Sequence, residues 1–449
     1  MKTIFFDLET TDLNTVGQIL NYALVEIDED WNMRSCLRGN IKLSRLQLPA
    51  PGAICANNVD VFEHNKTADD SESSAMAKIQ KYISDISEWD QTRLVGYNSN
   101  KFDVPYLRTS MIRNGLNPYF SRSVKYGDLL HVAKRLACDN PNFYEKLLKK
   151  DDGQPSFRME SVAKSFGLLE DAQKHESLSD VMLTIKVAKF IHENYGIDVR
   201  SYSSYEVDSK KKFDAIRVFP YVDGTGNKIS DEYCYLALLG ESKTQALWIN
   251  LKKYEDGLGK GAISWTNKNT SMLFVRDYIK DDTQAKRAEQ ARDALSHVNL
   301  DNFFGPKNCD VEQFIFMMPI SEISPLYEAV WMKDLTSLKN IKSKYCSKLY
   351  LRHLANELPV EQVEQQIKDY ALYRYGGRMK LSKINFDSVY EPGVYSPDFH
   401  PTYNEFMQQI DELSKNEKNK FLMDQLKKYY ENSVIATLAG SELRGIVRK

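Results

Sequence analysis

Two carboxylates lie two residues apart at the end of an apolar run near the N-terminus. Asp7 and Glu9 follow Ile4-Phe5-Phe6, and this run predicts a short, mostly buried β-strand. Because side chains alternate along a strand, Asp7 and Glu9 project from the same face. A solvated acidic pair is the ordinary interpretation of such spacing. Two carboxylates on a buried strand, however, need a cation to neutralise them, so the pair is a candidate metal site.

Two more carboxylates and a histidine stand at the ends of other predicted elements. Asp103 closes the polar segment 96–103, which follows a short apolar run; alone, it could equally cap the next helix. Asp180 stands where a strong helical pattern begins, and it could simply be an acid favoured by the helix dipole. His175 lies five residues before Asp180 in a predicted loop, where a lone histidine is usually a surface residue.

Taken together, these residues are suited to phosphodiester hydrolysis. Four carboxylates offer hard oxygen ligands, which select Mg²⁺ or Mn²⁺ over zinc. Two such ions about 4 Å apart clamp the attacking and leaving oxygens of an in-line displacement. His175 titrates near neutrality and could take a proton from the attacking water. The candidate metal ligands are Asp7, Glu9, Asp103 and Asp180.

The order of these motifs resembles that of a known superfamily. F-D-L-E-T at 6–10, G-Y-N-x-x-x-F-D at 96–103 and H-x₄-D at 175–180 resemble the three exonuclease motifs of the DEDDh superfamily, which has a ribonuclease H-like fold. The stretch D-G-x-P-S-F-R-x-E at 152–160 is similar to a segment of the bacterial exonuclease I family. Further similarities to that family occur at Pro51–Ile54, Tyr126–Leu130, Ile320–Val330 and Ile367–Arg378.

The resemblance implies a separate role for each of the candidate catalytic residues. Asp7, Glu9 and Asp180 would hold the ion that activates water, and Asp7 and Asp103 would serve a second ion. His175 would be the general base. The implied cofactor is a pair of Mg²⁺ ions, for which Mn²⁺ could substitute. The implied reaction is 3′→5′ exonucleolysis of single-stranded DNA, which releases 5′-mononucleotides.

The same resemblance suggests which residues contact the substrate. Glu9 and Thr10 would approach the terminal nucleotide, in part through the backbone of Thr10. Arg158 would contact the substrate phosphate or the terminal nucleotide, and the alternative is a surface ion pair with Glu160. The expected partners are single-stranded DNA and, for a bacterial enzyme of this kind, single-stranded-DNA-binding protein. The family expectation is a monomer.

Periodicity predicts the elements that must position these side chains. Three strand-like runs followed by alternating helices and strands predict a mixed sheet with helices on its faces. The predicted strands are Lys2–Leu8, Ile19–Ile27, Met33–Leu43 and Leu94–Tyr97, and the predicted helices are Ser74–Ile86, Leu129–Cys138 and Asp180–Asn194. Asp128 is the expected N-cap of the second of these helices.

The chain length of 449 residues predicts two or three domains. We expect a ribonuclease H-like α/β exonuclease domain with a mixed five-stranded sheet at residues 1–200. A polar segment at 200–212 predicts a linker, and short β runs between glycine turns then predict a β-containing domain, SH3-like by the resemblance, at 201–340. Residues 341–449 are predicted to form a C-terminal helical domain.

Composition excludes several classes of protein. Hydrophobic residues make up 42% and charged residues 27% of the chain, as in ordinary globular proteins. No apolar run approaches the length of a membrane-spanning helix, and Asp7 interrupts the N-terminal apolar run, so we expect a cytoplasmic protein without membrane contact. The formal net charge is −2, and any basic surface for nucleic acid must therefore be local.

One basic window could supply such a surface. Residues 338–383 hold ten Lys and Arg side chains against four acidic ones, with tyrosines interleaved. A groove with aromatic platforms of this kind binds single strands, and Arg374 and Arg378 are the candidates for strand contact. The alternative is a solvated helix face whose tyrosines pack inward.

Two other functions stay open from the sequence. A DEDDh proofreading or RNA-trimming exonuclease would use the same catalytic residues, because DNA and RNA present the same phosphate. The long C-terminal extension and the segment at 152–160 favour the exonuclease I type. A catalytically inactive scaffold that binds single-stranded nucleic acid is disfavoured by the presence of all four carboxylates and the histidine.

Overall fold

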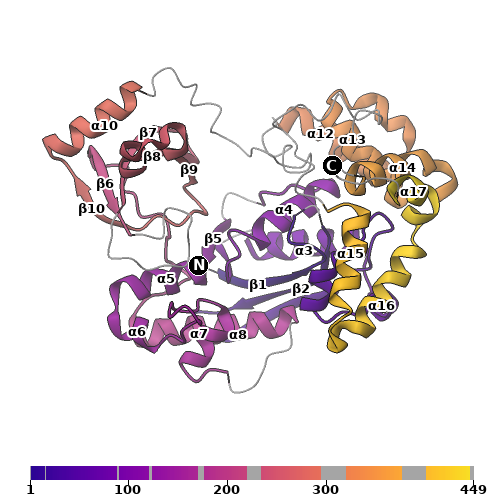
Figure 1. Ribbon diagram of the computed structural model, residues 1–449, viewed down its shortest axis with the longest axis horizontal. Coiled ribbons are helices and arrows are strands. Elements are labelled where there is room, and N and C mark those ends of the chain that lie inside the picture. The colour runs from indigo at the N-terminus through magenta and orange to yellow at the C-terminus, as the bar shows by residue number, and fades with distance from the viewer. Residues whose placement is uncertain are drawn as a thin grey trace.

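A computed structural model describes residues 2–15, 17–87, 91–120, 124–169, 176–219, 234–294, 320–376 and 401–444 (Figure 1). Its N-terminal part is built on a five-stranded sheet with the order β3-β2-β1-β4-β5. The strands are β1 (Lys2–Thr10), β2 (Ile19–Ile27), β3 (Met33–Asn40), β4 (Thr92–Gly96) and β5 (Val124–Asp128). The first three pair antiparallel, whereas β4 is parallel to both β1 and β5. The predicted mixed α/β sheet is therefore confirmed.

Alternate residues of β1 face two helical layers. Ile4, Phe6 and Leu8 pack against α3 and α4, whereas Phe5 packs against the layer that contains α5 and α8. Because Asp7 and Glu9 are in phase with Phe5, they project on the α8 side of the strand. The helices around the sheet are α1 (Pro51–Ala56), α2 (Val61–Thr67), α3 (Glu72–Ser87), α4 (Asp103–Arg113), α5 (Leu129–Asp139), α6 (Pro141–Lys146), α7 (Met159–Ser165) and α8 (Ser177–Tyr195).

A second sheet follows in the chain, and all of its strand pairs are antiparallel. Its order is β10-β6-β7-β8-β9, with Trp248 buried in its core. The strands are β6 (Ala215–Val218), β7 (Cys234–Glu241), β8 (Gln245–Asn250), β9 (Ile263–Asn267) and β10 (Val275–Ile279). Short helices α9 (Leu251–Lys253), η2 (Tyr254–Leu258) and η3 (Gly259–Ala262) connect β8 to β9, and α10 (Asp282–Ala294) follows β10.

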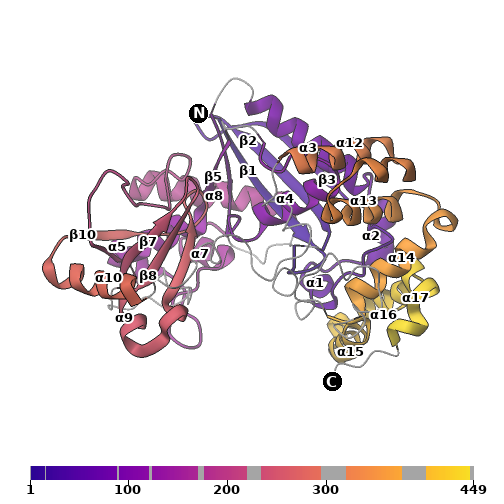
Figure 2. The same ribbon diagram turned by 90° about the horizontal axis from the view of Figure 1, so that it is seen from above.

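The remaining described part of the chain, from Ile320 onwards, is helical. Its elements are α12 (Ile320–Met332), η6 (Leu335–Asn340), α13 (Lys344–Glu357), α14 (Val360–Tyr375), α15 (Tyr403–Leu413), α16 (Glu417–Glu431) and α17 (Val434–Arg444). These helices and the second sheet lie at opposite ends of the molecule, with the first sheet between them (Figure 2). Tyr375, Phe406 and Tyr430 share one apolar core with Ile54 of α1 and Val61 of α2. The C-terminal helices therefore pack directly on the N-terminal part. Among the described residues, none of the helices has both the length and the apolar character needed to cross a bilayer.

Candidate active site

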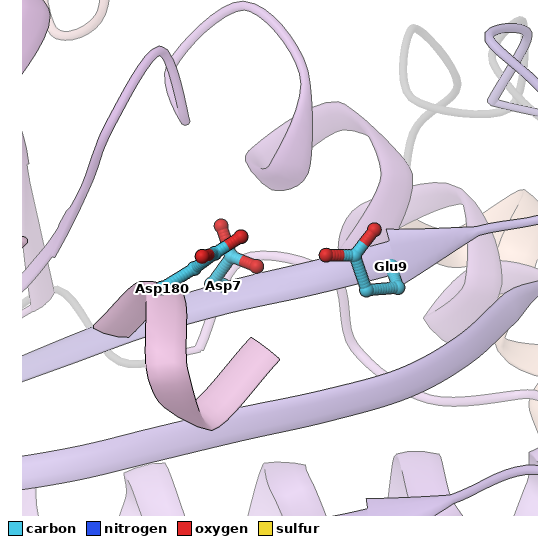
Figure 3. Close-up of side chains that lie close together, drawn as sticks. All are labelled: Asp7, Glu9 and Asp180. Atoms are coloured by element: carbon cyan, nitrogen blue, oxygen red, sulfur yellow. The ribbon is translucent and has the colours of Figure 1, made fainter. Parts of the chain in front are cut away.

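Three of the predicted ligands converge on one side of β1. Asp7 and Glu9 come from the strand itself, and Asp180 comes from the first turn of α8, which packs on that face of the sheet. One carboxylate oxygen from each of the three residues lies within 4.8 Å of the others, and Figure 3 shows the three groups projecting into the same space. Residues from strand and helix, 171 to 173 positions apart in the chain, thus form one carboxylate cluster.

The fourth carboxylate lies against the same strand. Asp103 is the first residue of α4 and is buried. Parallel pairing of β1 with β4 ends at Phe5, so the backbone N–H of Leu8 is open to another acceptor. That N–H donates a 3.2 Å hydrogen bond to Asp103 Oδ1. Asp103 is therefore held beside the β1 residue that separates Asp7 from Glu9.

Crowding among these carboxylates opposes their ionisation. Burial raises the pKa of Asp7 well above its ordinary value, and the neighbouring Asp103, Glu9 and Asp180 raise it further. Burial also raises the pKa of Asp103 to about 8, although its backbone hydrogen bonds oppose this shift. The pKa of Asp180 rises to about 7 through burial and through the charges of Glu9 and Glu160. A divalent cation would relieve this repulsion and favour the ionised forms.

The donor set fits a hard metal ion. All of its groups are carboxylates, and oxygen ligands of this kind suit Mg²⁺ and Mn²⁺ better than zinc, which prefers nitrogen and sulfur. Asp7 is the best placed of the four carboxylates to bind two ions, because both Asp180 and Asp103 are close enough to it to raise its pKa. The arrangement can therefore hold divalent cations at the edge of a cleft and polarise a phosphate that enters it.

Asp128 organises the turn that leads to Asp103. As predicted, it caps α5, and its Oδ1 accepts a 3.0 Å hydrogen bond from the N–H of Leu130. The same carboxylate accepts hydrogen bonds from the N–H groups of Asn98 and Asn100, at 2.8 and 3.1 Å. Asn98 has a φ of 61°, a left-handed conformation that asparagine tolerates better than most residues. The cap residue thus also fixes the loop between β4 and α4.

A cavity of about 740 Å³ opens beside the carboxylate cluster. Asp180 and the exposed side chain of Arg158 both line it, which places the predicted substrate-contacting arginine next to a candidate metal ligand. Thr10 ends β1 with a buried side chain, and its Oγ1 donates to the carbonyl of Asp12 at 3.0 Å. The cavity is lined by Tyr97, Asn98, Leu130, Lys134, Lys150, Phe157, Arg158, Met159, Glu160 and Asp180.

Two cations of this cavity were not singled out by the sequence. Lys134 lies on α5 and Lys150 follows α6, and both line the cavity that Arg158 and Asp180 share. Lys134 is 9% exposed, and its burial lowers the pKa of its ammonium group. In the sequence, Lys134 is one basic residue on an amphipathic helix, so only the packing of α5 reveals that it faces the cleft.

The remaining predicted residues are either outside the described part of the chain or buried. His175 lies outside the described residues, so its proposed role stays a prediction. The prediction that Arg374 contacts a bound strand is wrong, because its side chain is 1% exposed and pairs with Asp12 at 2.9 Å. Arg378 lies outside the described residues. Tyr350, Tyr370, Tyr373 and Tyr375 of the same basic window are buried, which favours the alternative in which the tyrosines pack inward.

Comparison with known proteins finds a family match in the N-terminal part. Residues 4–188 match the exonuclease family RNase_T. The exodeoxyribonuclease I of Haemophilus influenzae is 26% identical over 303 residues, which cover 64% of this chain and 56% of that protein. The enzyme of the same name from Escherichia coli is 30% identical over 150 residues, which cover 32% of this chain and 30% of that protein. The sequence match thus spans about half or less of these relatives' length.

The fold is similar to exonuclease I over nearly the whole chain. The structure of Escherichia coli exonuclease I in complex with a dA16 oligonucleotide superposes with a TM-score of 0.71 at 16% identity, covering 96% of this chain and 99% of that one. An ExoI/SSB-Ct complex superposes with a TM-score of 0.69 and the same coverage. The predicted fold class and the resemblance to bacterial exonuclease I are confirmed.

Proposed function

We propose that this chain, whose residues 4–188 are an exonuclease-family domain, is a metal-dependent 3′→5′ exonuclease that degrades single-stranded DNA to 5′-mononucleotides. One observation carries the proposal. Carboxylate oxygens of Asp7, Glu9 and Asp180 lie within 4.8 Å of one another, and Asp103 is hydrogen-bonded to the same strand. A cluster of acids beside a cation-lined cavity is suited to holding metal ions and a phosphodiester together.

Each candidate ligand receives a role in this proposal. Asp7, Glu9 and Asp180 would bind one Mg²⁺, and Asp7 and Asp103 a second, with Mn²⁺ as a competent substitute. The bound ions would supply Lewis acidity at the phosphate and a water of lowered pKa. His175 would accept the proton of that water. The raised carboxyl pKa values of Asp7, Asp103 and Asp180 support a site built to be completed by cations.

The cavity beside the cluster would hold the 3′ end of the strand. Arg158, Lys134 and Lys150 offer positive charge to phosphates, and the ring of Phe157 adds an apolar surface for the terminal nucleotide. Glu9 and Thr10 approach that nucleotide from the end of β1. DNA as the substrate is supported by relatives named exodeoxyribonuclease I and by the similar fold of an exonuclease I complex with dA16.

The resemblance also guides expectations about partners. The similar fold of an ExoI/SSB-Ct complex supports single-stranded-DNA-binding protein as a partner of this chain. We extend the proposal to a monomeric enzyme that acts in DNA repair in the cytoplasm. Size-exclusion chromatography with light scattering, alone and with the partner protein, tests the oligomeric state and the complex together.

End-labelled oligonucleotides test the activity directly. Single strands labelled at the 5′ or the 3′ end are incubated with the protein in Mg²⁺ or EDTA. We expect immediate release of the 3′ label as a mononucleotide, a ladder of shortening 5′-labelled strands, and no cleavage in EDTA. Asp7→Asn is the control for a contaminating nuclease. Release from the 5′ end, or cleavage in EDTA, would contradict the proposal.

A matched RNA strand separates the competing activities. We expect slower loss of RNA than of DNA under the same conditions. Faster loss of RNA would favour an RNA-trimming enzyme. Strand binding with no metal-dependent hydrolysis would favour a catalytically inactive scaffold.

A further inference from the structure

A buried ion pair joins the C-terminal helices to the end of the catalytic strand. Arg374 lies in the last turn of α14, and its Nη2 donates to Asp12 Oδ2 at 2.9 Å. The side chain of Arg374 is 1% exposed and that of Asp12 is 13% exposed. The two residues are separated by 362 positions in the chain. An arginine so deeply buried requires a charged partner, and Asp12 is that partner.

Asp12 is also the residue on which the turn after β1 is built. Its carbonyl oxygen accepts hydrogen bonds from Thr10 Oγ1 and from the hydroxyl of Tyr106, both at 3.0 Å. Its Oδ1 accepts from the N–H of Asn14 at 3.0 Å. Gly17 leaves room for this contact, because a Cβ there would lie 2.1 Å from the Tyr106 hydroxyl. Asp12 thus joins the turn at the end of β1 to two distant segments, those of Tyr106 and Arg374.

Two of the elements that meet at this turn, β1 and α4, carry candidate catalytic residues. Thr10 ends the strand that presents Asp7 and Glu9. Tyr106 lies three residues after Asp103 on α4, so the two side chains lie on one face of that helix. Arg374 forms an ion pair with the side-chain carboxylate of Asp12. The backbone carbonyl oxygen of the same residue accepts hydrogen bonds from Thr10 and Tyr106. A contact made by α14 therefore braces the turn that joins the end of β1 to α4, in addition to the hydrogen bond between Leu8 and Asp103.

We propose that Arg374 is a positioning residue, which acts through Asp12 to set the spacing between the carboxylates of β1 and Asp103. This inference rests on the proposed function, because it assigns those carboxylates to metal binding. Arg374 itself is not among the residues that line the cavity. Without the pair, the turn after β1 loses its tie to α14, and the spacing between the ligands on β1 and α4 depends more heavily on the hydrogen bond between Leu8 and Asp103. Displacements of about 1 Å can reduce turnover by roughly 100-fold.

Conservative variants test this proposal by Mn²⁺ binding as well as by activity. Asp12→Asn keeps the shape of the side chain, and Arg374→Gln removes the cation. Calorimetric titration with Mn²⁺ alone measures ligand spacing without substrate, and kcat and KM are measured on single-stranded DNA. We expect each variant to weaken Mn²⁺ binding several-fold and to lower kcat roughly tenfold, with a smaller change in KM. The double variant should be no worse than either single one, because both remove the same contact.

Arg45→Gln is the matched control for loosened packing. Arg45 also joins the N-terminal part to the C-terminal helices, through hydrogen bonds from its Nε to the carbonyl of Ala355 and from its Nη2 to that of Leu358, but it does not contact Asp12. We expect Arg45→Gln to lower the melting temperature with normal Mn²⁺ affinity and normal kcat. Unchanged Mn²⁺ affinity and kcat in Asp12→Asn, or equal losses in Arg45→Gln, would overturn the positioning role.

The two proposals fail in different ways. If the wild-type protein cleaves no strand in Mg²⁺, the proposed function is wrong, and the Mn²⁺ titrations of Asp12→Asn and Arg374→Gln still decide whether the ion pair sets the ligand spacing. If the wild-type protein is active and both variants match it in Mn²⁺ affinity and kcat, only the positioning role is wrong.

Discussion

Buried acids have opposite surroundings at two places in the N-terminal part. Glu72 of α3 faces Arg113 of α4, whose Nε and Nη2 donate to its carboxylate at 2.7 to 3.1 Å. Asn114 Nδ2 adds a further hydrogen bond at 3.2 Å. Asp7, by contrast, is surrounded by the charges of Asp103, Glu9 and Asp180, all of which raise its pKa. Burial alone therefore does not distinguish the two places; the sign of the neighbouring charge does.

This difference separates a structural acid from the candidate functional ones. The pair between Glu72 and Arg113 is complete within the chain, so its acid needs nothing from solution. The carboxylate cluster at β1 is less stable as more of its members ionise, and an external cation reverses that penalty. Acids with raised pKa values in a cleft are candidates for function. The contrast predicts that substitutions in the carboxylate cluster lower activity and raise stability in the absence of metal, whereas substitution of Glu72 lowers stability and leaves activity unchanged.

Asp7→Asn tests the proposed role of the carboxylate cluster, and it has the largest expected effect on turnover. Turnover on single-stranded DNA should fall roughly 10⁴-fold or more, because Asp7 is the proposed ligand of both ions. The melting temperature in EDTA should rise, because one of the crowded carboxylates is gone. Strand binding in EDTA should be near normal. Activity within tenfold of wild type would remove Asp7 from the site, and a lower melting temperature in EDTA would contradict the crowding.

His175→Ala distinguishes the loss of proton transfer from the loss of metal binding at the carboxylate cluster. We expect turnover to fall by roughly 10²–10⁴-fold, the range for loss of a general base, while Mn²⁺ affinity measured by calorimetry stays near normal. His192→Ala, on α8 beside the ring of Trp31, is a control for the loss of an imidazole. A variant whose turnover matches wild type would exclude His175 from the chemistry.

Glu72→Gln tests the structural side. Removing the charge leaves Arg113 buried beside a neutral partner, and we expect the free energy of unfolding to fall by about 3 kcal/mol. Denaturant melts measure that loss. Turnover per folded molecule should be unchanged, since Glu72 does not line the cavity beside the carboxylate cluster. A stable variant with reduced turnover would reverse the assignment of the two places.

Local patterns in the sequence predicted four of the five strands of the first sheet and helices α3, α5 and α8, but they did not predict β5. The alternation of β1 placed Asp7 and Glu9 on one face, and the spacing after Asp128 correctly predicted a capped helix. These inferences succeed because strand alternation and helix capping depend on neighbours in the chain. The convergence of Asp180 on β1 did not follow from periodicity; the shared chemistry of the carboxylates suggested it, and the resemblance to a family supported it.

Contacts between distant segments lay beyond local patterns. Arg374 occurs among lysines and tyrosines, which is typical of a solvated or strand-binding face, yet it is buried against Asp12. Lys134 has the context of an ordinary surface lysine, yet it lines the cavity. A charged residue becomes internal when a partner comes from elsewhere in the fold, and the partner of Arg374 lies 362 positions away in the chain.

The pH dependence of stability is the mildest test of the contrast. The pKa of Asp103 is about 8 and that of Asp180 about 7 in the folded protein, against about 4 for an aspartate in an unfolded chain. Between these values the folded state binds protons that the unfolded chain has released, so stability is fully present near pH 4 and is lost as the pH rises towards 8. We expect the melting temperature in EDTA to fall by several degrees between about pH 5 and 8.

Calorimetric scans of three samples isolate the cause of that fall. Asp103→Asn removes the acid with the pKa of about 8, so its melting temperature should vary less with pH than that of the wild type. Mn²⁺ added at about pH 8 should raise the wild-type melting temperature more than that of the variant, because the cation replaces the protons that the cluster has lost. Glu72→Gln should keep the full wild-type slope, since its pair is separate from the cluster. A slope unchanged in Asp103→Asn would place the titrating groups outside the carboxylate cluster and remove the contrast on which the assignment of the site depends.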